Sequence, residues 1–229
     1  MLEALRAEVC EANLELVRRG LVLYTFGNAS GLSREQGLVA IKPSGVPYEK
    51  MTPADMVIVD LEGRVVEGAL RPSSDLPTHV ALYRAFPSVG GVEHTHSRHA
   101  TAWAQAGREI PCFGTTHADY FHGPVPVTVP LTPAEIESEY EANTGAAIIR
   151  LLEARDQLGC PAALVAGHGP FTWGQSPAAA AHMAAIVEEL AAMAWQTLAI
   201  HPAAAPISDA LRDKHYFRKH GPKAYYGQK

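Results

Sequence analysis

The chain has 229 residues, of which 47% are hydrophobic and 19% are charged, and its formal net charge at pH 7 is −5. This composition is typical of one globular α/β domain with a sizeable core, and the acidic balance argues against nucleic acid as the main partner. Three cysteines, far apart in the chain, exclude a disulfide framework and a cysteine-based zinc site. No secretion signal or membrane span is predicted, so we expect a soluble, cytoplasmic protein.

The first third of the chain predicts one helix and two strands. Apolar residues at helical spacing predict a helix over residues 2–19, which Gly20 ends. A short buried strand is expected over residues 21–25. A turn of small residues over 27–31 and a second strand over 38–41 follow.

A lysine stands directly after the second predicted strand. Gly, Ser and Asn between strands usually mark turns only. Lys42, however, adds a mobile ammonium beside the Ser44 hydroxyl and the Gly45 amide, and Asn28 lies in the preceding turn. We therefore predict a cradle for a phosphate monoester. The segment is not a Walker sequence, so a nucleoside triphosphate is not indicated.

A hairpin is predicted over residues 56–60 and 65–67, and a helix is predicted to begin near Pro77. Ser74 and Asp75 precede that helix. Because the first amides of a helix are unpaired, these residues favour either an anion site or a simple helix cap.

Two histidines in the next predicted strand, over residues 89–96, suggest a metal site. On a strand, His94 and His96 would point to the same face. His168, between two glycines, and Asp75 supply a third imidazole and a carboxylate. Such donors suit a divalent transition ion such as zinc, with positions left open for a substrate.

A polar stretch over residues 114–121 is interpreted either as a solvated loop or as the place of a general acid or base, Asp119. A strand is then expected over 125–129, followed by a helix over 133–140, opened by a capping box at Thr132 and Glu135, and a helix over 144–158. The last predicted elements are a strand over 162–166, a hairpin return over 171–174 and a helix over 177–199 capped by Ser176. The tail over 208–229 is either frayed or packed over a neighbouring active site.

Several motifs occur together and in order, namely Thr25–Asn28, Ile41–Val46, Arg71–His79, Glu93–Thr101, Gly114–Tyr120, Gly167–Phe171 and Asp213–Gln228. On these motifs the chain resembles the class II aldolase/epimerase family over nearly its whole length, and most closely its pentulose-phosphate epimerase branch. The resemblance implies a three-layer α/β/α fold with a central, mainly antiparallel sheet. It also implies a single domain over residues 1–229 and a C4 homotetramer, in which the tail from about residue 208 completes the active site of the neighbouring subunit.

The resemblance assigns site residues by position. It implies that Asp75, His94, His96 and His168 bind the metal, usually Zn²⁺, with Mn²⁺ or Co²⁺ as alternatives. The phosphate-binding positions are Gly27, Asn28, Lys42, Ser44, Gly45, Ser73 and Ser74. Asp119 and Tyr226 match the acid/base pair, with Tyr226 supplied by the adjacent subunit, and His215 is an assisting residue.

The activity implied is metal-dependent epimerisation of L-ribulose 5-phosphate to D-xylulose 5-phosphate at C4, in an arabinose or ascorbate pathway. It would proceed by retro-aldol cleavage and re-addition through an enediolate. A fuculose-phosphate-type aldolase is one alternative, although that branch has Glu at the position of Asp75 and lacks the surroundings of Asp119. A non-catalytic sugar-phosphate binding protein is another. In each case the partner is a small sugar phosphate, and no membrane is involved.

Overall fold

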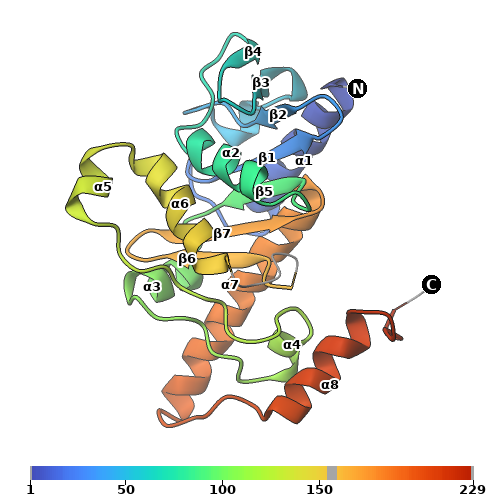
Figure 1. Cartoon of the computed structure of the whole chain (residues 1–229), viewed down its shortest axis with the longest axis vertical. Helices are drawn as coiled ribbons and strands as arrows, with labels where there is room; N and C mark the ends of the chain where they lie inside the picture. The colour runs from blue at the N-terminus through green and yellow to red at the C-terminus, as the bar shows by residue number, and fades with distance from the viewer. Residues whose placement is uncertain (1, 154–158, 228–229) are drawn as a thin grey trace.

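The computed structural model describes residues 2–153 and 159–227, which form a seven-stranded sheet with helices on both faces (Figure 1). The sheet order is β4-β3-β2-β1-β5-β7-β6, and each pairing between named strands is antiparallel. The strands are β1 (Asn28–Ser33), β2 (Leu38–Ile41), β3 (Val57–Asp60), β4 (Val65–Glu67), β5 (Gly91–His94), β6 (Ala162–Val165) and β7 (Gly169–Gly174). The helices are α1 (Leu2–Arg18), α2 (Leu76–Ala85), α3 (Arg98–Gln105), α4 (Thr115–Ala118), α5 (Pro133–Glu137), α6 (Tyr140–Leu152), α7 (Pro177–Ile200) and α8 (Asp209–Lys219), with 3₁₀ turns η1 (Tyr48–Lys50) and η2 (Pro53–Asp55).

Alternation along the strands divides the core into two layers. Val39 and Ile41 of β2 belong to the apolar cluster that α2 and α6 cover, whereas Ala40 between them packs in the cluster beneath α1. In β6, Ala163 faces the α2 and α6 side, and Leu164 faces α3 and α7. Successive residues of a strand point to opposite faces, so both faces of the sheet are buried along its central strands, whereas the edge strand β4 is exposed. The predicted three-layer α/β/α fold with a mainly antiparallel sheet is confirmed.

The prediction for residues 21–31 is wrong. Residues 21–25 form no strand, because they connect α1 to the sheet and Tyr24 lies exposed in a turn with a φ of 54°. The predicted turn over 27–31 instead contributes to β1, a central strand. Small residues suit this place because helices pack closely against it: a Cβ on Gly31 would lie 2.6 Å from Cγ of Pro177.

The predicted strand over residues 125–129 is also wrong, since this segment forms two isolated bridges and no named strand. Pro124, Pro126 and Pro130 explain the difference. A proline has no amide hydrogen to donate to a neighbouring strand, so alternate positions cannot extend the ladder. The strand predicted over 89–96 does exist as β5, but it ends at His94.

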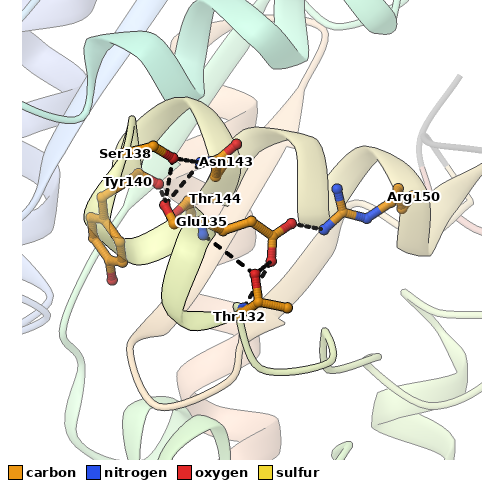
Figure 2. Close-up of polar contacts among 7 residues, drawn as sticks. All are labelled: Thr132, Glu135, Ser138, Tyr140, Asn143, Thr144 and Arg150. Carbon is orange, nitrogen blue, oxygen red and sulfur yellow. Dashed lines mark hydrogen bonds and ion pairs between the residues drawn. The ribbon is translucent and has the colours of Figure 1, made fainter.

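The capping box at Thr132 is confirmed, while the helix that it opens is shorter than predicted. The Thr132 hydroxyl accepts from the amide of Glu135, whose carboxylate accepts in return from the Thr132 amide (Figure 2). Helix α5 ends at Glu137, and α6 begins at Tyr140 instead of Thr144. The Asn143 side chain donates to the Glu135 carbonyl and so joins the two helices. The predicted end of that second helix, residues 154–158, lies outside the described residues.

The polar stretch over 114–121 contains the short helix α4 and is not a plain loop. The tail contains α8, whose Ser208 hydroxyl accepts from the amide of Leu211, so residues 209–219 are not a frayed end. Packing over a neighbouring active site, the other alternative, stays a prediction. Helix α8 packs against α4. Figure 1 shows these two helices together, well apart from α5 and the start of α6.

Helix α7, predicted over 177–199, is confirmed with its Ser176 cap. By length and composition alone it would also qualify as a membrane span, with a mean hydropathy of 1.3. In the structure Val187, Leu190 and Ala191 are buried, and the helix contacts α1, α3 and the sheet. Core packing therefore accounts for the apolar residues on its inner face, while Trp195 and Ile200 near its end are 58% and 86% exposed.

Candidate metal centre and active site

Three predicted histidines converge where β5 ends and where β6 turns into β7. His94 is the last residue of β5, His96 lies two residues past it, and His168 lies in the β6–β7 turn. One ring nitrogen from each lies within 4.8 Å of the other two. The Nε2 atoms of His94 and His96 are 3.0 Å apart. The tertiary structure thus joins residues that are more than seventy positions apart in the sequence.

Contacts on the outer side of the cluster orient two of these rings. Nδ1 of His94 lies 2.9 Å from the carbonyl oxygen of Pro170, which can only accept, so this nitrogen carries the proton. Nδ1 of His168 lies 3.1 Å from the Tyr140 hydroxyl. The second nitrogen of each ring is then left for an ion, which is how proteins usually hold metal-binding histidines.

Burial lowers the pKa of all three histidines, and the effect is largest at His94, which is 2% exposed. The neighbouring imidazoles lower the pKa values of His94 and His168 further. A neutral imidazole is the form that binds metal, so these side chains present three ready donors at neutral pH. This donor set fits a divalent transition ion such as zinc.

Asp75, the predicted fourth ligand, precedes α2 in the same pocket, and its side chain makes no capping hydrogen bond to that helix. Its Oδ2 accepts a hydrogen bond of 2.6 Å from Nδ2 of Asn28, the first residue of β1. Asn28 thereby orients the carboxylate. The sequence had predicted that this side chain binds phosphate, but its amide nitrogen donates to Asp75 instead. Ligation of the ion by Asp75 stays a prediction.

The cavity beside the histidines has a volume of about 420 Å³. The segments around Lys42 and Ser73 both line it and are held together by two backbone hydrogen bonds. The amide of Ser73 donates to the carbonyl of Lys42 at 3.0 Å, and the amide of Ser44 donates to the carbonyl of Arg71 at 2.9 Å. The predicted phosphate-binding residues Gly27, Asn28, Lys42, Ser44, Gly45, Ser73 and Ser74 all line this cavity. The structure therefore brings the metal and phosphate predictions into one pocket.

Lys42 is buried yet poorly paired. Within residues 2–153 and 159–227, its Nζ reaches two backbone carbonyls, those of Thr25 at 3.5 Å and Pro43 at 3.4 Å, and lies 4.8 Å from the ring centre of Tyr48. Burial lowers the pKa of Lys42 to about 8, so the ammonium is still mostly charged at pH 7. An anion in the cavity would meet a cation with few competing partners.

Sequence reasoning missed Tyr48, Tyr140 and Glu141. Tyr140 and Glu141 line the cavity from the start of α6. The ring of Tyr140 points away from the capping contacts that fix this turn (Figure 2). Tyr48 lies beneath Lys42, and its hydroxyl donates to the carbonyls of Phe26 and Gly27, both at 2.9 Å. No local pattern marks these residues, because their partners are distant in the sequence.

Tyr140→Phe is expected to weaken metal binding by about tenfold while leaving the fold intact, because it removes only the hydroxyl that orients His168. Isothermal titration of the metal-free protein with Zn²⁺ measures this. Tyr24→Phe, which changes an exposed tyrosine that does not line the cavity beside the histidines, is the matched control. Equal zinc affinity in Tyr140→Phe and the unmodified protein would rule out the orienting role.

The predicted acid/base residues lie elsewhere in this chain. Asp119 follows α4, and its Oδ1 lies 3.1 Å from Nδ1 of His215 on α8. Tyr226 packs against the same helix. None of the three lines the cavity beside the histidines. One subunit therefore brings these three residues together without bringing them to its own candidate metal site.

Comparison with known proteins identifies the family of the chain. Residues 7–195 match the family model described as class II aldolase and adducin N-terminal domain. Two relatives named L-ribulose-5-phosphate 4-epimerase UlaF, from Salmonella paratyphi C (strain RKS4594) and Salmonella paratyphi A (strain ATCC 9150 / SARB42), are 56% and 55% identical over 228 residues, and each alignment covers 100% of both chains.

Solved structures give the same family. An L-fuculose 1-phosphate aldolase superimposes with a TM-score of 0.79 at 25% identity, covering 94% of this chain and 95% of its own. The L-fuculose-1-phosphate aldolase from Thermus thermophilus has a TM-score of 0.68 at 25% identity, covering 89% of this chain and 98% of its own. The chain therefore belongs to the class II aldolase family, as its sequence motifs predicted.

Proposed function

We propose that this protein is a metal-dependent L-ribulose-5-phosphate 4-epimerase that inverts C4 to form D-xylulose 5-phosphate. The observation that carries the proposal is one cavity that has a histidine cluster on one side and the Lys42 cradle on the other. The names of relatives that are 56% identical over the full length support it. We further propose a single domain over residues 1–229, acting in the cytoplasm as a C4 tetramer with zinc as its usual metal.

The substrate dictates the chemistry. C4 is not adjacent to the C2 carbonyl, so its proton is not acidic and direct removal is unfavourable. Cleavage of the C3–C4 bond avoids this difficulty. His94, His96 and His168, with Asp75 as a fourth ligand, would hold a divalent ion, whose positive charge would stabilise the electrons left on the three-carbon fragment.

The phosphate cradle retains the other fragment. The phosphate is on C5, so cleavage leaves it on glycolaldehyde phosphate, the aldehyde that must rotate before the bond re-forms. Lys42 holds this group by charge, while the Ser44 hydroxyl and the Gly45 amide supply hydrogen-bond donors. An aldehyde anchored at its phosphate can turn its carbonyl face without leaving the pocket, so the product is an epimer and not two released fragments.

Proton transfer at the C4 oxygen needs one group on each face of the aldehyde. We assign these roles to Asp119 and Tyr226, which remove the hydroxyl proton during cleavage and return one after re-addition, with His215 assisting. Because neither residue lines the cavity of its own chain, we propose that they act on the site of a neighbouring subunit.

A fuculose-phosphate-type aldolase is the second candidate, favoured by the structural similarity to the L-fuculose 1-phosphate aldolase. Both activities need the histidine cluster and the cradle. They differ in their products, since an aldolase acting on a pentulose phosphate would release dihydroxyacetone and glycolaldehyde phosphate.

The purified protein is expected to convert L-ribulose 5-phosphate to D-xylulose 5-phosphate, to lose this activity with a chelator and to regain it with Zn²⁺. A coupled assay for D-xylulose 5-phosphate measures the conversion, and chelator already saturated with Zn²⁺ is the control. Full turnover after verified metal removal would contradict the metal-dependent mechanism. Release of two fragments as the main products would favour the aldolase.

A further inference from the structure

Arg218 on α8 contacts both predicted acid/base residues. Its Nε donates to Oδ1 of Asp119 at 3.0 Å, and its Nη2 donates to Oδ2 at 2.6 Å. These two parallel hydrogen bonds fix the carboxylate in a plane. The guanidinium carbon also lies 4.8 Å from the ring centre of Tyr226. One side chain therefore determines the place of Asp119 and supports the ring of Tyr226.

The backbone of Arg218 strengthens the second contact. Its carbonyl accepts hydrogen bonds from the amides of Tyr225 at 2.9 Å and Tyr226 at 3.0 Å, so the chain folds back onto the end of α8. Without these bonds, residues near the end of a chain would be expected to fray. Tyr226 is thus held against Arg218 by its main chain as well as by its ring.

Other basic side chains surround Asp119. From α8 and the residue after it come Nδ1 of His215 at 3.1 Å from Oδ1, Nζ of Lys219 at 3.4 Å from Oδ2 and Nε2 of His220 at 3.0 Å from the Asp119 carbonyl. On the α4 side, His117 is engaged with the carbonyl of Gly123. Lys219 also lies 4.7 Å from the Tyr226 ring centre, but among the described residues Arg218 alone makes a two-bond contact with the carboxylate.

Of the residues that Arg218 contacts, Tyr226 is accessible to a neighbouring subunit. Tyr226 is 59% exposed, while Asp119 is buried beneath α8. Because Arg218 joins them, any neighbouring site that Tyr226 reaches must lie close to Asp119 of the same chain. An arrangement in which Asp119 serves its own subunit while Tyr226 serves the neighbour would require this contact to break.

We propose that Arg218 is a positioning residue that joins Asp119 and Tyr226 into one preformed unit, which a single subunit presents to the cavity of its neighbour. The inference rests on the proposed epimerase function and adds to it which chain supplies each group. Mixtures of inactive variants can test which subunit supplies Asp119 and Tyr226 to each cavity.

Three pairs of variants, co-expressed with two tags and purified through both, test the presentation. His96→Asn with Tyr226→Phe, and His96→Asn with Asp119→Asn, should each regain activity, because about a quarter of randomly paired sites combine an intact histidine cluster with an intact unit. Asp119→Asn with Tyr226→Phe should regain none, since every unit then lacks one group.

Any other pattern of recovery among the three pairs contradicts one part of the proposal. Recovery in the third pair would overturn the proposal, because it requires Asp119 and Tyr226 from different chains. Failure of both pairs that contain His96→Asn would overturn presentation to a neighbour. The epimerase assay of the unmodified protein stands apart from these mixtures, so the proposed activity can hold while the presentation fails.

Arg218→Gln tests the positioning role. Burial by itself would raise the pKa of Asp119, but the hydrogen bonds of Arg218 and His215 and the charges of Lys219 and Arg218 outweigh it and lower that pKa. Without Arg218 the pKa should rise, so the acidic limb of the kcat/KM profile should move to higher pH. We expect kcat to fall about a hundredfold, with the zinc content unchanged and partial recovery in Arg218→Lys.

Arg212→Gln is the matched control, since Arg212 is on the same helix, its side chain has the same 24% exposure and it pairs with Asp209 and Asp213. It should leave both kcat and the pH profile unchanged. An Arg218→Gln protein with normal kcat would overturn the positioning role. So would one that loses activity with an unshifted pH profile and no recovery in Arg218→Lys.

Discussion

Replacing His96 with asparagine is expected to remove the bound metal and to lower epimerase activity by more than about a hundredfold, since even partners outside the ligand shell cost up to that much in metal affinity. Asparagine is shorter, and its amide is a poor ligand for a transition ion. His96 is the most exposed of the three histidines, and its ring contacts are with Phe26, His94 and His168, so the substitution should act mainly on the cluster itself. Elemental analysis of the purified variant measures the metal, and the coupled assay measures the activity.

His201→Asn is the control for His96→Asn, because His201 is exposed at the end of α7 and far along the chain from the cluster. It should keep full metal and full activity. A His96→Asn protein with complete metal occupancy would show that His96 is not a ligand, whatever its activity.

Asp119→Asn and Tyr226→Phe are each expected to lower kcat by about 10² to 10⁴, the usual contribution of a positioned general acid or base. Both substitutions keep the shape of the side chain and remove the proton-transfer group. The histidine cluster has no contact with either residue in the described chain, so the metal content should be unchanged. Steady-state kinetics with L-ribulose 5-phosphate, together with elemental analysis, separates the two effects.

Tyr225→Phe is the control for Tyr226→Phe, since the two tyrosines are adjacent and similarly exposed, at 62% and 59%. Asp213→Asn is the control for Asp119→Asn, because Asp213 is a paired aspartate on α8 that contacts His122 and Arg212. Turnover at the unmodified rate in both Asp119→Asn and Tyr226→Phe would exclude the assigned roles. A loss of equal size in the controls would point to a disturbed tail.

The unit around Arg218 bears on why an aldolase-type fold would yield an epimer. Cleavage needs the ion and the cradle, but inversion also needs a proton donor on the second face of the aldehyde. In the roles proposed for them, Tyr226 and Asp119 would supply two such groups at a fixed spacing only if a third residue holds them together. The contacts of Arg218 with both residues supply that constraint.

Patterns within a few residues were predictable from the sequence. Helices α1 and α7, the Ser176 cap, the capping box at Thr132 and the β3–β4 hairpin depend on local spacing and hydrogen bonds, so their signals survive without the rest of the fold. The donor types at His94, His96 and His168 were likewise readable, because few other chemistries use closely spaced and glycine-flanked histidines.

Only the tertiary structure decided the rest. Residues 28–33 look like a turn locally, yet they form a central strand because small side chains allow α1 and α7 to pack closely against it. The contact of Tyr140 with His168 and that of Arg218 with Asp119 join residues 28 and 99 positions apart. Such contacts depend on how helices pack on the sheet, which no short stretch of sequence encodes. The sequence alone therefore determined which chemical groups the protein carries, and the packing of its layers decided which of them meet.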